Sequence, residues 1–161
     1  LHKAAQTGKK VMIATGAATL AEVTRAVEIL KTYKVPIVLM QCNTNYTGSD
    51  ENFDYIHLNV LHTYRKMFPD VTLGLIAHTP GSVTVLGAIS LGATVVEKHF
   101  TDDNKRVGPD HSFSMTPETW KKMVDDTRVL ERSLGGSEKK VEDNEKETVC
   151  FNVGHFDLLE T

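Results

Sequence analysis

Short apolar runs alternate along this chain with longer segments of helical periodicity. The runs lie at 11–15, 36–41, 72–76 and 94–97, and each is followed by a segment whose apolar residues recur every three or four positions. Continuous apolar runs are typical of parallel strands buried on both faces, and amphipathic helices cover such strands. The pattern therefore predicts four strand–helix units in succession.

Capping residues indicate where the predicted helices begin and end. Thr19 followed by Glu22 is a capping-box pattern, and Thr116 followed by Pro117 is a typical helix start. The four predicted helices begin after Thr19, extend from about 53 to 68, run from Gly81 or Ser82 to Gly92, and run from Thr116 to Gly135.

Four strand–helix units make half of an eight-stranded barrel. We therefore predict an α/β fold at 1–136, the (βα)4 half of a TIM-type barrel with parallel strands alternating with helices. The segment KKVEDNEKET is highly charged and almost without apolar residues. Such a segment cannot bury a core of its own, so we expect 137–161 to be a charged linker or disordered tail.

Composition is that of one soluble domain. The chain has 161 residues, of which 40% are hydrophobic and 24% charged, and its formal net charge is -3. No apolar run approaches the ~20 residues of a membrane span, and the beginning, LHKAAQTGKK, lacks a signal-peptide stretch. No basic stripe indicates a nucleic-acid partner. We expect a cytoplasmic protein that binds neither membranes nor nucleic acid.

Two histidines stand where predicted strands end. His78 follows the third strand, in VTLGLIAH, and His99 follows the fourth, in ATVVEKH. Because parallel strands end at the same edge of a barrel, these two side chains are expected to meet there. Imidazole is a common ligand of catalytic divalent metals. A single strand-end histidine more often has a structural role, but two at equivalent positions favour a metal site.

Five motifs in order resemble one known family. They are ATG at the end of the first strand, QCNTNY at the end of the second, GLIAHT at the end of the third and EKHF at the end of the fourth, followed by GPDHSFSM, within about 8–149. This series is similar to the sialic acid synthase family, whose members condense phosphoenolpyruvate with an N-acetylmannosamine-type sugar to form N-acetylneuraminate or a related nonulosonic acid. The resemblance implies the last four strands of an eight-stranded catalytic barrel. Since the chain begins with Leu1 and has no counterpart of the first four strands, we expect a fragment or truncated product that is inactive in isolation.

The resemblance also implies roles for individual residues. His78 and His99 match the protein ligands of a divalent metal, manganese or magnesium, and Glu97 matches a catalytic acidic residue beside it. Asp110 matches the sugar-binding aspartate, and Asn43, Thr44 and Tyr46 resemble the segment that contacts phosphoenolpyruvate and the sugar. The implied partners are therefore phosphoenolpyruvate and an amino sugar. Unpaired strands at both edges of a half-barrel also lead us to expect a homo-oligomer.

Several of these positions allow a simpler interpretation. Glu97 by itself would pair with Lys98 or Lys105, and Gly-Pro-Asp by itself is typical of a turn. Two other histidines, His57 and His62, are expected on the second predicted helix and outside the site. His111 follows Asp110 and could reach the same cleft, but a solvated loop residue is the favoured interpretation.

Three positions depart from the pattern of the resembled family. Ala14 and Ile76 stand where it has serines associated with the substrate phosphate, and Ala77 stands where it has an aspartate next to the metal-binding histidine. Losing a hydrogen bond to a charged group costs about 1.5 to 3 kcal/mol. The departures favour an alternative, a noncatalytic half-barrel or degenerate paralogue that binds sugar or associates with another half. A different metal-dependent aldolase is a third hypothesis, against which the order of the motifs argues.

Overall fold

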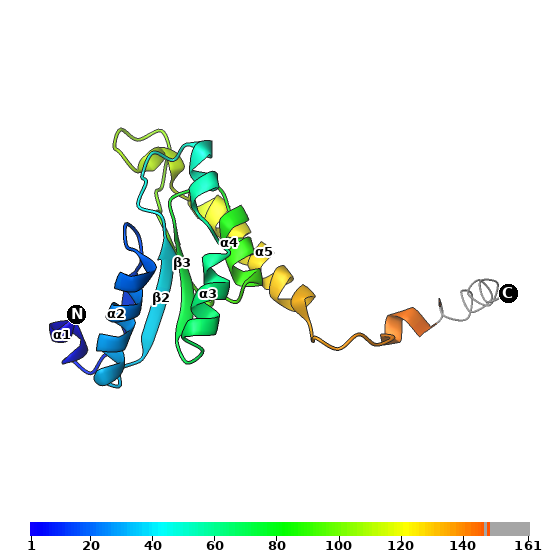
Figure 1. The fold of residues 1–161 in the computed structure, drawn as a ribbon. Helices are drawn as coiled ribbons and strands as arrows, with labels where there is room; N and C mark the ends of the chain where they lie inside the picture. The colour runs from blue at the N-terminus through cyan, green and yellow to red at the C-terminus, as the bar shows by residue number, and fades with distance from the viewer. Residues whose placement is uncertain (147, 149–161) are drawn as a thin grey trace.

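The computed structural model describes residues 1–146 and 148, and its centre is a parallel four-stranded sheet (Figure 1). The strands are β1 (Val11–Ala14), β2 (Ile37–Cys42), β3 (Thr72–Ala77) and β4 (Val95–Lys98), and they lie in the order β1-β2-β3-β4. Every neighbouring pair is parallel. A helix lies between successive strands, so the predicted (βα)4 half-barrel is confirmed.

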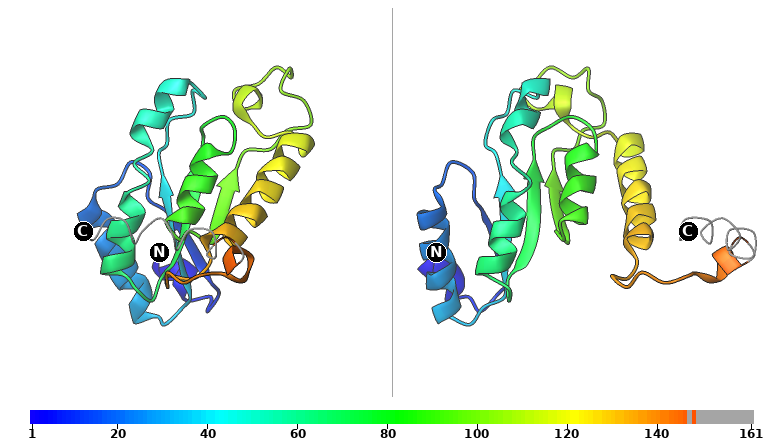
Figure 2. Two further views of the ribbon diagram at one scale, coloured as in Figure 1. Left: turned by 90° about the vertical axis from the view of Figure 1, so that its right-hand side faces the viewer. Right: turned by 45° about the vertical axis from the view of Figure 1, so that its right-hand side comes forward.

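Helices cover one face of the sheet, as Figure 2 (left) shows for the helices in front of the strands. The helices are α1 (His2–Ala5), α2 (Leu20–Thr32), α3 (Val60–Met67), α4 (Val83–Ser90) and α5 (Pro117–Leu134), with 3-10 turns η1 (Asp50–Tyr55), η2 (His111–Phe113) and η3 (Asp143–Glu145). Leu39 and Leu75 of the sheet pack with Leu30 and Leu61 of the helices in a single core. The helix-facing side of the sheet is therefore the core of the domain.

The opposite face of the sheet is exposed at some positions of β1 and β3 and buried at the central strand β2. Met12, Val38 and Thr72 lie side by side in register on this face. Met12 is 51% exposed and Thr72 is also exposed, whereas Val38 between them is 1% exposed. In a closed barrel this side would face the interior, so we refer to it below as the inner face.

The two helix starts predicted from capping residues are confirmed. Thr19 and Glu22 form a capping box before α2, in which the backbone N–H of Thr19 donates to the Glu22 carboxylate at 2.8 Å. Thr116 caps α5, and Pro117 is its first residue. Proline suits this position because its missing N–H would have no helical partner there.

The helix predicted over 53–68 is wrong in its first part. The chain forms the 3-10 turn η1 and then, after residues 56–59, the helix α3. The side-chain amide of Gln41 donates to the carbonyl of Ile56 at 3.0 Å, which diverts that carbonyl from a helical ladder. His57 then adopts a positive φ of 49°. His57 is therefore an exposed residue of a connection and not of a helix, whereas His62 is exposed on α3 as expected.

The chain leaves the core after α5. Gly135 has a φ of +52°, and the residues from 137 to 146 are exposed and include η3. The rest of the predicted tail, at 147 and 149–161, lies outside the described residues. No helix within the described ranges has the length and apolarity to cross a membrane.

Candidate functional site

The two strand-end histidines lie together at the carboxyl edge of the sheet. Ile76 of β3 and Glu97 of β4 are paired in register, so the residues two positions later, His78 and His99, continue the same row. The centroids of the two imidazole rings are 5.2 Å apart and the ring planes meet at 65°. The parallel register thus brings the two side chains into contact.

A hydrogen bond determines which nitrogen of His78 carries hydrogen. Its Nδ1 lies 2.7 Å from the carbonyl oxygen of Asn43, which can only accept. Nδ1 is therefore the protonated nitrogen of the neutral ring, and Nε2 keeps its lone pair. A backbone carbonyl in this place is the usual partner that orients a metal-binding histidine.

His99 has an acidic neighbour. Its Nδ1 lies 3.5 Å from Oδ2 of Asp110, which directly precedes η2. The ring of Phe113 also packs against His99, with the two ring centroids 5.2 Å apart. The loop between β4 and α5 therefore contributes both a carboxylate and a buried aromatic ring to the site.

Tyr46 covers the histidine pair. Its ring centroid lies 4.0 Å from that of His78, at a tilt of 34°, and 5.5 Å from that of His99. Tyr46 itself is 49% exposed, whereas His78 is only 2% exposed. We call Tyr46, His78, His99 and Phe113 the aromatic cluster. It joins loops that follow β2, β3 and β4.

Glu97 lies on the inner face, in the same row as Ile76 and Cys42. Its side chain is exposed, unlike that of Cys42. Burial raises the pKa of the Cys42 thiol, and the nearby Glu97 carboxylate raises it further. Glu97 and His99 alternate with Lys98 along the strand, so both face the inner side.

We expect the Cys42 thiol to be alkylated more slowly at pH 7.5 than free cysteine, because the thiolate is the nucleophile and the raised pKa keeps it scarce. Glu97→Gln, in a Cys150→Ser background, should increase the rate severalfold, since it removes the negative charge that disfavours the thiolate. Iodoacetamide labelling followed by mass spectrometry measures this rate, with Glu118→Gln as the distant control. Equal rates in the Glu97 variant and its parent would contradict the placement of Glu97 in the same row as Cys42, one strand beyond Ile76.

Asn43 and Thr44 lie at the side of the aromatic cluster. The Asn43 backbone reaches His78, but its side-chain amide donates to the carbonyl of Tyr55 at 3.3 Å. The methyl group of Thr44 lies so close to Gly16 that a Cβ there would be 2.3 Å from it. Among the expected substrate-contacting residues of this loop, Tyr46 is therefore the one whose side chain touches the histidines.

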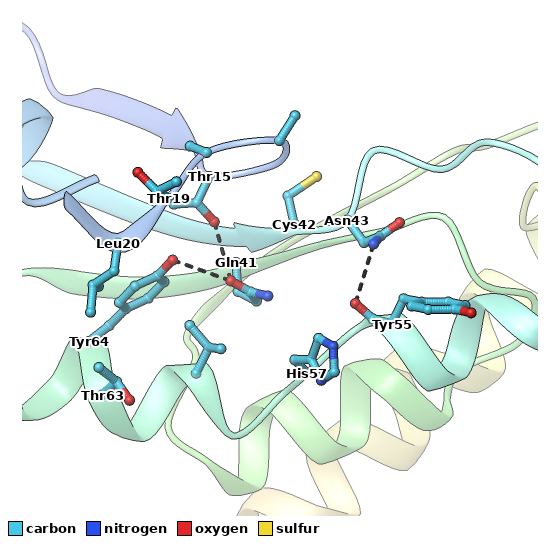
Figure 3. Close-up of a pocket in the computed structure, with 13 residues that line it drawn as sticks. Thr15, Thr19, Leu20, Gln41, Cys42, Asn43, Tyr55, His57, Thr63 and Tyr64 are labelled. Atoms are coloured by element: carbon cyan, nitrogen blue, oxygen red, sulfur yellow. Dashed lines mark hydrogen bonds between the residues drawn. The ribbon is translucent and has the colours of Figure 1, made fainter. Parts of the chain in front are cut away.

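A cavity of about 540 Å³ borders Asn43 on the helix side (Figure 3). Its polar floor is Gln41, whose Oε1 accepts hydrogen bonds from the hydroxyls of Thr15 at 3.2 Å and Tyr64 at 3.4 Å. Burial raises the pKa of the Tyr64 phenol. Each of these polar groups has a hydrogen-bond partner, as buried polar groups require. The network therefore links the ends of β1 and β2 to α3 and to the connection that precedes it.

Sequence reasoning missed the contact between Phe113 and Gly48. Gly48 has a φ of +64°, and a Cβ there would lie 2.6 Å from Cβ of Phe113. The loop that carries Tyr46 therefore packs directly on η2. Phe113 belongs to the GPDHSFSM motif, and its apolar side chain in a polar loop was the available signal.

Gly48→Ala should destabilise the protein by about 1 to 3 kcal/mol, because the position needs a positive φ and the added methyl meets Phe113. Urea denaturation measures the change. Gly136→Ala is the matched control, since nothing lies within 4 Å of the added Cβ. Equal midpoints for the two variants would show that the two loops are not packed this tightly.

The expectation for His111 is wrong. The residue is half-buried, and its Nδ1 lies 2.7 Å from the hydroxyl of Thr101, which is itself buried. The carbonyl of His111 accepts from Asn104 at 2.6 Å. These contacts make His111 a structural residue of the loop, which the sequence alone does not reveal because its partners lie seven to ten positions away.

The three positions that depart from the family pattern lie on different faces. Ile76 lies on the inner face, in the row of Cys42 and Glu97. Ala14 pairs with Met40 on the same face and is exposed. Neither side chain carries a hydroxyl. Ala77 is 1% exposed, belongs to the core and pairs with Lys98 across the strands. A carboxylate at position 77 would therefore face the helices and would not stand beside the histidines.

The site offers two imidazole nitrogens, which could hold a divalent ion that keeps open positions. Within residues 1–146 and 148, no three His, Cys, Asp or Glu side chains form a metal-binding group. The two histidines would supply nitrogen ligands to such an ion, and its remaining positions would be left for oxygen atoms of water or substrate, which Mn²⁺ and Mg²⁺ accept. A closed structural site of the zinc type would need four protein ligands, which this arrangement lacks.

Fold and site together define an α/β half-barrel with a paired-histidine site at the carboxyl ends of its strands. The chain belongs to the NeuB family, whose model matches residues 1–139.

Relatives of known name support this membership. The chain is 31% identical over 141 residues to human N-acetylneuraminate-9-phosphate synthase, covering 88% of this chain and 38% of the human protein. It is 32% identical over 152 residues to N,N'-diacetyllegionaminic acid synthase of Campylobacter jejuni, covering 92% of this chain and 44% of that protein.

The crystal structure of an N-acetylneuraminic acid synthetase from Leptospira borgpetersenii, in complex with citrate, aligns with a TM-score of 0.81 at 27% identity. The alignment covers 95% of this chain and 52% of that one. The chain thus spans about half, or less, of the length of these relatives.

Proposed function

We propose that this chain serves sugar-acid biosynthesis as the carboxyl-terminal half of a barrel that condenses phosphoenolpyruvate with an N-acetylmannosamine-type sugar. The observation that carries the proposal is the meeting of His78 and His99, 5.2 Å apart, with Asp110 and Tyr46 against them. Relatives named as synthases of neuraminate and legionaminate derivatives support the same broad role.

His78 and His99 would hold Mn²⁺ or Mg²⁺ in this proposal. When bound, the ion supplies a Lewis acid that polarises the aldehyde oxygen of the open-chain sugar. The hydrogen bond from His78 Nδ1 to the Asn43 carbonyl supports this role, because it leaves Nε2 as the ligating nitrogen.

The other side chains bind and orient the reactants. Asp110 accepts hydrogen bonds from sugar hydroxyls, and its position 3.5 Å from His99 lets it steady that imidazole as well. The exposed ring of Tyr46 offers an apolar surface to the sugar. Glu97 orients a water or a hydroxyl and exchanges a proton with it on the inner face. Asn43 and Thr44 border the phosphoenolpyruvate.

Phosphate binding requires groups from elsewhere, because Ala14 and Ile76 offer no hydroxyl. We propose that a second barrel half covers the inner face and supplies them, and that the chain alone is inactive. The unpaired edges of β1 and β4 favour association, so a homo-oligomer in the cytoplasm is part of the proposal.

A second candidate function is binding of the sugar without turnover. The missing hydroxyls at Ala14 and Ile76 favour it, whereas Asp110 and the aromatic cluster are compatible with both functions.

A complementation assay separates the two functions. The chain is combined with the amino-terminal barrel half of the Campylobacter jejuni relative, and phosphate release from phosphoenolpyruvate is followed with Mn²⁺ and N-acetylmannosamine. The synthase proposal predicts release that Asp110→Asn reduces at least 100-fold, while Asp125→Asn on α5 leaves it unchanged. Saturable sugar binding without release would favour the second function. Neither binding nor release would contradict both.

A further inference from the structure

Lys98 is a buried cation between the two residues of the EKH motif that face the inner side. It is 8% exposed, and its ammonium donates to the backbone carbonyl of Thr79 at 2.6 Å. This contact lies on the helix-facing side of the sheet, opposite Glu97 and His99. It joins the end of β4 to the end of β3.

The acceptor of this hydrogen bond is itself fixed. Thr79 is fully buried, and its hydroxyl lies 2.9 Å from that of Thr84 in α4. Thr79 directly follows His78, and Lys98 directly precedes His99. The hydrogen bond between Lys98 and Thr79 therefore links the immediate neighbours of both histidines, and the second one, between Thr79 and Thr84, anchors them to the start of α4.

The burial of Lys98 is unfavourable by itself. Its cross-strand neighbour is Ala77, so this pairing supplies no carboxylate, and the acceptor Thr79 is a neutral carbonyl. Desolvation accordingly lowers the pKa of Lys98 to about 8. An apolar residue at position 98 would avoid this desolvation, which favours a role for the Lys98 ammonium other than stability.

We propose that Lys98 is a positioning residue, whose bond to Thr79 holds His78 and His99 at their mutual distance on the opposite side of the sheet. The proposal rests on the proposed function insofar as it takes the histidine pair as a metal site. It assigns Lys98 no contact with substrate or metal.

The test compares the full chain with Lys98→Met and Lys98→Arg. Methionine keeps the length and apolar stem but removes the donor, whereas arginine keeps a cationic donor. Mn²⁺ affinity is measured by calorimetry, and the tautomer of His78 is measured without metal by long-range ¹H–¹⁵N NMR of the imidazole rings. We expect Lys98→Met to weaken Mn²⁺ binding at least tenfold and to give His78 a mixture of tautomers. Lys98→Arg should stay within about threefold of the parent.

Two controls separate positioning from stability. Lys31→Met removes a surface lysine that pairs with Asp70, and it should change neither readout. Val27→Ala destabilises the core within α2, far along the sheet from the histidines, and should lower the unfolding temperature without changing Mn²⁺ affinity or the tautomer. Lys98→Met is expected to weaken Mn²⁺ binding and change the tautomer without lowering the unfolding temperature. The unfolding temperature is kept because removing a desolvated charge offsets the loss of the hydrogen bond.

Each outcome either supports or overturns the positioning role of Lys98. If the parent binds Mn²⁺ and Lys98→Met binds it equally well with an unchanged His78 tautomer, the positioning role is overturned. If the parent binds no Mn²⁺, the metal proposal fails, and the NMR readout alone judges Lys98: a changed His78 tautomer upholds it and an unchanged one overturns it. Weakened binding that Val27→Ala reproduces would assign the effect to stability and also overturn the role.

Discussion

His99→Ala will weaken Mn²⁺ binding by at least 100-fold, whereas His111→Ala will change it less than threefold. The reason is that His99 would be one of only two protein ligands, while His111 is engaged with Thr101 in the loop. Losing a direct ligand should cost at least the 10- to 100-fold that loss of an outer-shell partner costs. Calorimetric titration of the two variants and the parent measures the affinities.

The comparison of these two histidines is informative because they are close in sequence and both lie near Asp110. Equal losses in both variants would indicate that the loop as a whole matters and that His99 has no direct role. If both variants bound Mn²⁺ as tightly as the parent, His99 would not be part of the metal site.

Leu39→Ala will destabilise the protein by about 2 to 5 kcal/mol. Leu39 is fully buried on the helix-facing side of β2, and alanine there would leave a cavity in the core. Met12→Ala, on the inner face of β1, should cost less than about 0.5 kcal/mol in the same chain because Met12 is 51% exposed. Urea denaturation followed by circular dichroism gives both free energies of unfolding.

The contrast between Leu39 and Met12 tests which face of the sheet is the core. A large loss for Met12→Ala would mean that the inner face is covered in solution, for example by a second copy. Measuring the Met12 variant over a range of protein concentrations distinguishes that case, because the stability of an associated state depends on concentration.

The sequence predicted the architecture because apolar runs and caps are local signals. Thr19, Thr116 and Pro117 act within one helical turn, so their patterns could be interpreted without the fold. The error over 53–68 arose from a long-range contact, the hydrogen bond from Gln41 to Ile56, which no local pattern contains. Helical periodicity continues through Ile56 in the sequence, but the buried side chain of Gln41 binds the Ile56 carbonyl, and the helix begins only later.

The site was predictable in part for the same reason. The meeting of His78 and His99 follows from parallel register and needs only the strand ends. The sequence marks Phe113 as an apolar residue in a polar loop, but its contact with Gly48 and that of Lys98 with Thr79 depend on how distant segments pack, so their partners could not be predicted. Ala77 differs from these contacts, because the alternation of side chains along a strand already places the residue next to His78 on the opposite face.

The most direct test of the histidine-pair metal site is an NMR titration of the unsubstituted chain with Mn²⁺. A paramagnetic ion broadens nearby signals most, so the resonances of His78, His99 and Tyr46 should disappear first, at substoichiometric metal. The same titration of the His78→Ala, His99→Ala double variant should leave the Tyr46 signals sharp. Broadening centred on the acidic residues of α5, or equal broadening in the double variant, would contradict a metal site at the strand ends.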